Sequence, residues 1–261
     1  MNELHITPRA VARRRFMRRA LGGGSALLLA GCDRLGESAS FNRLLSVGEA
    51  LNRGVRSAVG RSGVQTMAQE FSKADLSPRF RGNGNTDPDS DAYKALAANG
   101  FADWKLVIGG RVDRPAALSL AELRAMPSRT QITRHDCVEG WSAIGQWTGV
   151  PLAALLALVQ PKPDARYVVF HCADAFRDGT YYESIDLLDA HHPQTLLAYA
   201  LNDETLPITN GAPLRLRVER QLGYKHAKYL MRLELVADFA HIAGGRGGYW
   251  EDRGYEWYAG I

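Results

Sequence analysis

One cysteine stands among side chains that could do chemistry in the segment RHDCVEGWSAIGQWTGVP, residues 134–151. Cys137 has His135 and Asp136 before it and Glu139 after it. A thiolate close to an imidazole can serve as a nucleophile or as a soft metal ligand. Cysteine is also one of the residue types most often buried for structural reasons alone. These residues by themselves leave all three roles open.

Short strands and helices must hold this segment in place. Ser119, followed by Glu122 three residues later, predicts a capping box for a short helix that ends before Pro127. A second helix is predicted over 151–159, and Asp186 is expected to cap a third that reaches Ala190. Apolar, β-branched and aromatic residues predict strands over 104–112, 130–133, 167–171, 180–185, 196–200, 214–218 and 230–236.

The mixture of these elements predicts an α+β fold with a largely β core, because strands and helices follow one another without a regular βαβ repeat. The stretch RGNGNTDPDSD at 81–91 is too rich in Gly, Asn, Asp and Pro for regular backbone. Such a loop either crosses the surface or lines a site.

Three motifs in the same order resemble the sulfite oxidase family of molybdopterin-dependent oxidoreductases, most closely its periplasmic methionine sulfoxide reductase branch. They are CVEGWS with the following WTGVPL, LNDETLPITNGAPLRLRV at 201–218 and GYKHAKYL at 223–230. The likeness extends from about Phe80 to the C-terminus. It implies a molybdopterin-binding oxidoreductase domain of the sulfite oxidase type over 76–261. It also implies oxygen-atom transfer at molybdenum, in the direction of reducing a small S-oxide or N-oxide.

The resemblance assigns roles to single residues. Cys137 matches the thiolate that binds molybdenum, so it is the expected catalytic residue and metal ligand. Asn83, in the sequence FRGNG, matches an asparagine that contacts the cofactor. Asn210 and Arg215 match residues that hold the pterin and its phosphate, where an amide suits the heterocycle and a guanidinium suits the anion.

Four further positions follow from the same resemblance. Lys225 and Lys228 match phosphate and pterin contacts, and His192 aligns with a histidine of the family. Cys172 stands where the reductase branch carries a threonine near the metal, so a second thiol is expected at the cofactor. That position shapes the open face of the metal. With Cys172 in place of the threonine, the resemblance does not determine the identity of the substrate.

Residues 1–31 have the features of an export signal. Arg13, Arg14, Phe16, Met17 and Arg18 fit the twin-arginine pattern, and the apolar run that follows is too short to span a membrane as a helix. The run ends in Leu-Ala-Gly-Cys, which resembles a lipobox and predicts a lipid anchor at Cys32. An ordinary cleavable signal with a chance cysteine is the alternative. By resemblance to bacterial sorting rules, the following aspartate favours retention at the periplasmic side of the inner membrane.

The segment from 32 to 75 is predicted to be a linker with an amphipathic helix over 41–59, which packs on the domain or lies at the membrane interface. Residues 1–31 hold six arginines and one acid, a net charge of about +5, whereas the whole chain carries +4. The remainder is therefore close to −1, which excludes a basic footprint for nucleic acid. The expected partners are a small-molecule substrate and a membrane cytochrome or quinol-linked electron donor. Since the cofactor motifs lie close to Ile261, a compact, monomeric enzyme is expected.

Three alternatives remain at this level. Sulfite-type oxidation needs a cationic pocket, which Arg81, Arg134 and Arg177 could supply. A zinc protein could use His135, Cys137, His171 and Cys172, although their spacings are tighter than usual zinc motifs. A non-catalytic binding module could also use the same scaffold.

Overall fold

A computed structural model of the chain describes residues 66–176 and 178–261, together with separate residues between 38 and 55. The chain divides into two units, Met1–Val64 and Gln65–Ile261. In the first unit, the described residues from 40 to 55 are helical, which agrees with the predicted amphipathic helix. The twin-arginine segment and Cys32 lie outside the described residues. In the described part of the chain, no helix is long and apolar enough to cross a membrane.

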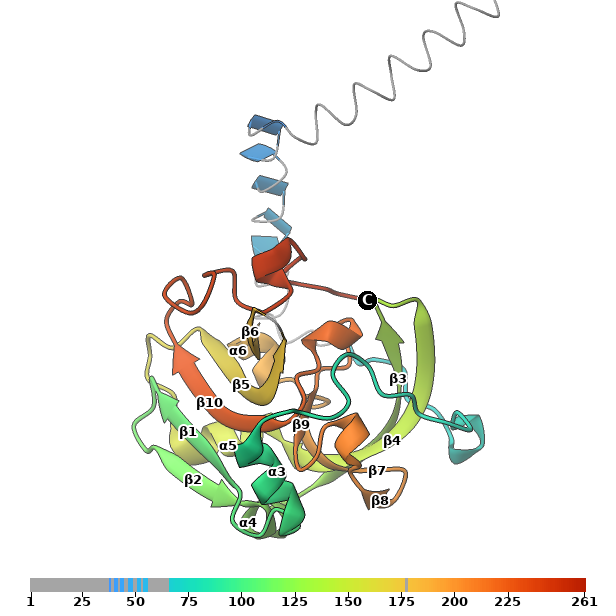
Figure 1. Cartoon of the computed structure of the whole chain (residues 1–261). Coiled ribbons are helices and arrows are strands. Elements are labelled where there is room, and N and C mark those ends of the chain that lie inside the picture. Colours follow the sequence, from blue (N-terminus) through green and yellow to red (C-terminus); the bar gives the residue numbers. More distant parts are fainter. Residues whose placement is uncertain are drawn as a thin grey trace, which may run out of the picture. The chain divides into compact units, whose positions relative to one another are not determined.

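The second unit is built on two five-stranded sheets (Figure 1). The first has the order β2-β1-β10-β5-β6, made of β2 (Ala116–Ser119), β1 (Lys105–Gly110), β10 (Leu230–Val236), β5 (Tyr167–Phe176) and β6 (Gly179–Asp186). The second runs β3-β4-β7-β8 with β9 added to β7, made of β3 (Arg129–Cys137), β4 (Trp141–Pro151), β7 (Leu196–Leu201), β8 (Glu204–Thr205) and β9 (Arg215–Arg217). Only the β1–β10 pair is parallel among the described strands.

Short helices complete the unit. The α-helices are α3 (Asp91–Ala98), α4 (Leu120–Ala125), α5 (Leu152–Val159) and α6 (Leu187–Ala190), and the 3-10 turns are η1 (Lys73–Asp75), η2 (Ile208–Asn210), η3 (Gly223–Lys225) and η4 (Glu251–Arg253). The main core joins both sheets, since Phe170 of β5 and Leu235 of β10 belong to one buried cluster with Val150 of β4 and Leu216 of β9. A smaller cluster surrounds Trp147 on the second sheet. The predicted α+β fold with a largely β core is confirmed.

The predicted caps are confirmed in detail. The Ser119 hydroxyl accepts a hydrogen bond from the Glu122 amide at 3.2 Å, and the Glu122 carboxylate accepts one from the Ser119 amide at 2.8 Å. The Asp186 carboxylate accepts from the Asp189 amide at 2.9 Å, which starts α6 as expected. The predicted strands are all present, although β3 and β5 are longer than the predicted segments.

The long strand β4, the short strands β2 and β8, the helix α3 and the 3-10 turns were not predicted. In β4, Gly145 and Gly149 interrupt the alternation of side chains, and both are required by close packing. A Cβ atom on Gly145 would lie 2.8 Å from the Phe80 ring, and one on Gly149 would lie 2.2 Å from the Leu197 carbonyl oxygen. These glycines weaken the strand pattern in the sequence, but they allow β4 to pack against Phe80 and Leu197.

The segment 81–90 is irregular, as predicted, and leads into α3. Ser90 caps this helix by accepting from the Tyr93 amide at 3.4 Å. The Tyr93 hydroxyl then donates to the Ala212 carbonyl at 2.7 Å. Helix α3 thus fixes the irregular loop beside the segment that carries Asn210 and Arg215.

Candidate functional site

A pocket of about 150 Å³ opens beside Cys137. Its walls come from the 83–85 loop, the β3–β4 turn, β5, β6, η3 and the C-terminal segment. Three of the residues singled out in the sequence line it: Asn83, Cys137 and Lys228. The other lining residues are Gly84, Asn85, Val138, Glu139, Asp174, Phe176, Tyr181, Gly223, Tyr224, His226, Trp250 and Tyr255.

Cys137 is the last residue of β3, where the hairpin to β4 turns. Its carbonyl accepts a hydrogen bond from the Gly140 amide at 3.0 Å, and Gly140 has φ +83°, a conformation that favours glycine. Cys137 is 8% exposed. Burial raises the pKa of Cys137, while a hydrogen bond from the Glu139 backbone amide acts in the opposite direction. A bound metal cation would be needed to hold this sulfur as a thiolate at neutral pH.

Lys228 ties the 81–91 loop to the pocket. Its ammonium group donates to the carbonyls of Asn83, at 2.5 Å, and Asn85. The side-chain oxygen of Asn83 is buried and has no partner within the described part of the chain. Burial, with a smaller effect of Arg215, lowers the pKa of Lys228 to about 7, and Asp174 opposes that shift. The pocket therefore holds a lysine whose positive charge is poorly stabilised by the protein alone.

Arg215 is a fully buried cation behind the same wall. It donates to the Asn210 carbonyl at 2.8 Å and lies 4.9 Å from the centre of the Trp147 ring. No ion pair to Arg215 is present among the described residues, and its Nε atom and the Asn210 amide nitrogen have no hydrogen-bond partner there. Burial, followed by the charge of Arg217, lowers the pKa of Arg215 to about 9. Such a cation calls for an anionic ligand.

Gly211 brings these groups together. It has φ +110°, and a Cβ atom at this position would lie 2.9 Å from the Lys228 side chain and 3.2 Å from Cβ of Arg215. The NGAP turn thus packs directly against both cations. The structure brings Asn210, Arg215 and Lys228 together, although Asn210 and Arg215 lie behind the pocket surface and do not line it.

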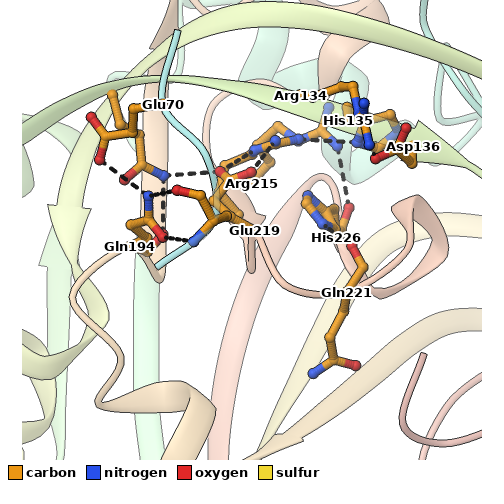
Figure 2. Close-up of polar contacts among 12 residues, drawn as sticks. Glu70, Arg134, His135, Asp136, Gln194, Arg215, Glu219, Gln221 and His226 are labelled. Atoms are coloured by element: carbon orange, nitrogen blue, oxygen red, sulfur yellow. Dashed lines mark hydrogen bonds and ion pairs between the residues drawn. The ribbon is translucent and has the colours of Figure 1, made fainter. Parts of the chain in front are cut away.

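A second buried arginine has the acid partner that Arg215 lacks. Arg217 and Glu219 are both fully buried and form a two-point ion pair, with distances of 2.5 and 2.9 Å. The network around Glu219 continues through Gln131 and Gln194 to Glu70 (Figure 2). Because Glu219 is already paired with Arg217, its charge offsets that of Arg215 only in small part.

The same network sets the protonation of His135. Arg217 donates to Nδ1 of His135 at 3.0 Å, and since a guanidinium can only donate, the neutral ring carries its proton on Nε2. Burial, then the charge of Arg217, holds the pKa of His135 well below its ordinary value. The Nε2 edge lies against Gly223, where a Cβ atom would be 2.5 Å away. Gly223 therefore allows the η3 turn to approach the strand that carries Cys137.

His226 offers the pocket a hydrogen-bond acceptor, whereas Nε2 of His135 carries a proton. Its Nε2 donates to the Gln221 carbonyl at 3.0 Å, which leaves Nδ1 as an acceptor (Figure 2). Nδ1 is buried without a partner in the described residues. Burial, with Arg217 as the next cause, holds the pKa of His226 well below its ordinary value. This role could not be predicted from the sequence, because His226 is a single position inside the GYKHAKYL motif.

Two predicted site residues lie elsewhere. The Lys225 ammonium is fully buried between the carboxylates of Glu183 and Glu251, which satisfy its charge. Nε2 of His192 donates to the Thr66 carbonyl, 3.2 Å away, and its Nδ1 accepts from the Gln194 amide at 3.2 Å. Neither lines the pocket. Both have protein partners, and their predicted contact with the cofactor stays a prediction.

Cys172 lies behind the wall of the pocket. It is 5% exposed and belongs to the main core. Burial raises the pKa of Cys172 well above its ordinary value, and the charges of Asp174 and Glu183 act in the same direction. Both cysteines of the second unit are free thiols. Asp174, two residues further along β5, reaches the pocket instead, and burial raises its pKa to about 7 against the opposing effect of Lys228.

The zinc alternative finds no support. The described residues contain no cluster of three or more His, Cys, Asp and Glu side chains that could hold a metal ion. His171 is bonded through Nε2 to Glu234 at 2.9 Å and to Arg232 at 2.8 Å, and His135 is bonded to Arg217. What the site offers is one thiol together with unpartnered polar atoms and two cations, a set suited to a polar, anionic ligand.

The chain is similar to known molybdopterin-binding oxidoreductases. The model of the oxidoreductase molybdopterin-binding domain family matches residues 94–241. A protein of Azospira oryzae designated as protein-methionine-sulfoxide reductase subunit YedZ1 is 37% identical over 256 residues, which are 95% of this chain and 88% of that protein. The catalytic subunit MsrP of protein-methionine-sulfoxide reductase from Xanthomonas axonopodis is 37% identical over 205 residues, 72% of this chain and 62% of MsrP.

Among solved structures, the sulfane dehydrogenase SoxCD of Paracoccus pantotrophus is similar with a TM-score of 0.49. Its sequence identity is 24%, and the match covers 52% of this chain and 39% of that one.

Proposed function

This chain belongs to the family of oxidoreductase molybdopterin-binding domains, and from that premise we propose that it reduces an S-oxide at a molybdenum ion bound by Cys137. The family resemblance found in the sequence is confirmed. The chain is a molybdenum-cofactor-dependent oxidoreductase, and its cofactor is the molybdenum complex of molybdopterin. One observation carries the proposal: the buried thiol of Cys137 lies near two cations, Arg215 and Lys228, that have no ion-pair partner among the described residues.

The residues at the pocket fit this cofactor. A buried polar group without a partner costs about 1–3 kcal/mol, so Asn83, Asn210, Arg215 and His226 together would be an expensive arrangement without a ligand. Molybdopterin carries a phosphate for the cations and a heterocycle with donors and acceptors for the amides. Cys137 would bind the metal, Arg215 and Lys228 the phosphate, and Asn83 and Asn210 the pterin.

When bound, the cofactor supplies a two-electron centre that exchanges an oxygen atom with the substrate. Reduction of an S-oxide consumes two electrons and two protons and releases a thioether and water. Two side chains in the pocket can supply a proton near neutral pH, because burial raises the pKa of Asp174 to about 7 and lowers that of Lys228 to about 7. We assign the proton to Asp174. The Arg217–Glu219 pair holds His135 in one tautomer behind Cys137 and so keeps the cysteine's strand in a fixed position.

Cys172 is part of this proposal as a residue behind the cofactor. Its thiol is influenced by Asp174 and Lys228, both of which line the pocket. The side chain there would pack against the cofactor's surroundings and would not bind the metal.

Reduction of an S-oxide is favoured over oxidation of sulfite by the charges at the pocket. Glu139 lines it, and its carboxylate would repel an anion such as sulfite. Of the arginines that could have formed a cationic pocket, Arg134 is paired with Asp136 at 3.0 Å, and Arg81 lies 5.6 Å from the centre of the Trp141 ring. Arg177 lies outside the described residues. The names of the relatives, which specify a protein-methionine-sulfoxide reductase, support the same direction.

The proposed setting is the periplasmic side of the inner membrane. Its support is the twin-arginine pattern at Arg13 and Arg14 and the lipobox that ends at Cys32. The relatives are named as subunits, which supports a partner protein, and the lipid anchor suits a membrane cytochrome or quinol-linked electron donor. We propose that the enzyme itself is a monomer.

The test is a comparison of two reactions on the purified, cofactor-loaded protein. Molybdenum and pterin analysis should give one of each per chain. With a reduced artificial dye as electron donor, the enzyme should reduce methionine sulfoxide and other S-oxides. With ferricyanide as acceptor, it should leave millimolar sulfite unoxidised. Rapid sulfite oxidation without S-oxide reduction would overturn the proposal.

A further inference from the structure

The residues that line the pocket beside Cys137 fall into two chemical groups, which we call the polar side and the aromatic side. The polar side comprises the 83–85 loop and the β3–β4 turn and carries the thiol. The aromatic side comprises Phe176, Tyr181, Tyr224, Trp250 and Tyr255. Cofactor binding explains the polar side, because amides and cations suit a phosphate and a pterin. It leaves the aromatic side without a role.

Three rings of this side form a continuous series, which we call the aromatic wall: Phe176, Trp250 and Tyr255. The rings of Trp250 and Tyr255 are stacked, with centroids 5.3 Å apart and an angle of 30°. The Phe176 and Trp250 rings meet edge to face at 6.0 Å. Tyr255 is 40% exposed, and Phe176 and Trp250 are half-buried, so the rings are not merely core residues.

Two of the wall's rings come from the C-terminal segment, which polar contacts attach to the rest of the domain. This segment, red in Figure 1, lies beside β5 and β6. Glu251, the residue after Trp250, is buried against Lys225. Close by, the Tyr182 hydroxyl donates to Asp252 at 2.6 Å, and Trp257 donates to the Ser184 hydroxyl at 2.8 Å. Lys225, which the sequence suggested for the cofactor, thus anchors the segment that forms the wall.

The wall limits what can bind next to the thiol. Aromatic faces favour apolar or aromatic groups and soft sulfur atoms. The carboxylate of Glu139 on the same pocket disfavours an anionic substrate. A matching ligand presents a polar oxygen toward Cys137 and a neutral apolar substituent toward the rings.

We propose that Phe176, Trp250 and Tyr255 bind the organic substituent of the S-oxide and make the enzyme select substrates with a large apolar or aromatic substituent over small or anionic ones. This inference rests on the proposed S-oxide reductase function. It assigns substrate selection to the aromatic wall and leaves the chemistry to the thiol side of the pocket.

Binding without turnover gives the first test. Methyl p-tolyl sulfone has the shape of an aryl sulfoxide and is not reduced, so its dissociation constant can be measured by calorimetry on the loaded, oxidised enzyme. Trp250→Leu and Tyr255→Leu should each weaken it by about tenfold, because a flat aromatic contact is lost. Trp250→Phe, which keeps an aromatic face, should retain most of the affinity. Tyr199→Leu is the matched control, since that ring lies against Arg124 outside the pocket.

Kinetics give the second test. For methyl p-tolyl sulfoxide, the two leucine variants should raise KM by about tenfold with little change in kcat. For dimethyl sulfoxide, whose methyl groups are too small to cover the rings, kcat/KM should stay within about twofold of the parent value. Unchanged sulfone affinity and unchanged KM in both leucine variants would overturn the inference, as would an equal loss for both sulfoxides. If the parent enzyme reduces neither sulfoxide while sulfone binding still depends on the wall, the proposed function fails and the binding role of the wall stands.

Discussion

The two buried arginines of the RLR strand differ in one respect that separates function from stability. Arg217 is paired with Glu219, whereas Arg215 has no acid partner in the described residues. Burying a charge without a partner costs stability, and replacing it by an apolar side chain of similar size is often neutral or stabilising. Arg215 is therefore explained by a ligand, and Arg217 by the fold.

We expect Arg215→Met to lower cofactor retention while leaving the cofactor-free protein as stable as the parent or more so. The lost charge-assisted bonds to a phosphate are worth about 1.5–3 kcal/mol. Pterin content after dialysis and urea unfolding of the cofactor-free form measure the two effects. Arg217→Met is the control, because it leaves Glu219 buried without a partner and should cost about 3–5 kcal/mol in the cofactor-free form. Full pterin retention in Arg215→Met would show that the phosphate lies elsewhere.

Asp174 gives a second prediction at this scale. Because burial raises its pKa to about 7, the carboxyl group holds its proton below that pH and loses it above. If it supplies a proton to the departing oxygen, S-oxide reduction should fall as the pH rises through about 7. The amide in Asp174→Asn cannot supply a proton, so kcat at pH 6 should fall by about a hundredfold or more, and the fall near pH 7 should disappear. The groups that share this region are Lys228, Tyr93, Tyr181, Tyr229 and Cys172.

The pH profile of kcat/KM between pH 5.5 and 8.5 is the measurement, with molybdenum content as the check on folding and loading. A profile that is the same in both proteins would assign the proton to another group.

At the scale of elements, the Glu183–Lys225–Glu251 cluster joins η3 and the C-terminal segment to β6. Two carboxyl groups share one ammonium in a fully buried place. Burial raises the pKa of Glu183 well above its ordinary value, and the charge of Glu251 acts in the same direction. Glu183 therefore binds a proton in the folded protein at pH values where the unfolded chain has released it.

A folded state that holds more protons than the unfolded chain loses stability as the pH rises. The free energy of unfolding should therefore decrease from about pH 4.5 upward toward the raised pKa of Glu183, and Glu183→Gln should flatten this decrease. Urea unfolding of the cofactor-free domain at several pH values measures it. Lys225→Met is the contrasting variant, because it leaves two acids buried without a cation and should cost about 3–5 kcal/mol at neutral pH. Parallel curves for parent and Glu183→Gln would contradict this account.

The elements were largely readable from the sequence because their signals are local. Capping boxes depend on side chains three residues apart, and Ser119 with Glu122 shows this directly. Strand β4 was not predicted, because its glycines are required by close packing against Phe80 and Leu197, which are distant in the sequence. The same limit applies to the site. Lys225 and Lys228 sit in one motif, and only tertiary packing decides that one meets two acids while the other reaches the pocket. Asp174 and the aromatic wall carried no local signal.

At the scale of the whole molecule, the N-terminal region and the catalytic domain predict a route of assembly. Twin-arginine export carries folded proteins, so the cofactor would be inserted before export. Replacing Arg13 and Arg14 with Lys should leave cofactor-loaded precursor in the cytoplasm, whereas Arg9→Lys, outside the motif, should be exported normally.

Cys32→Ala should release the exported protein from the membrane fraction without changing its molybdenum content. Cell fractionation with metal analysis measures both, and normal export of the double lysine variant would contradict the twin-arginine interpretation.

The central claim is that Cys137 binds the metal, and the chain contains its own control. Cys137→Ser replaces a soft thiolate with a hydroxyl that does not ionise at neutral pH, whereas Cys172→Thr changes a buried thiol that does not line the pocket. The most direct measurement is electron paramagnetic resonance of the Mo(V) state in both variants, with molybdenum content measured on the same samples. We predict that Cys137→Ser loses the parent signal and that Cys172→Thr keeps a Mo(V) signal and bound molybdenum. A normal signal in Cys137→Ser together with its loss in Cys172→Thr would contradict the assignment of the ligand.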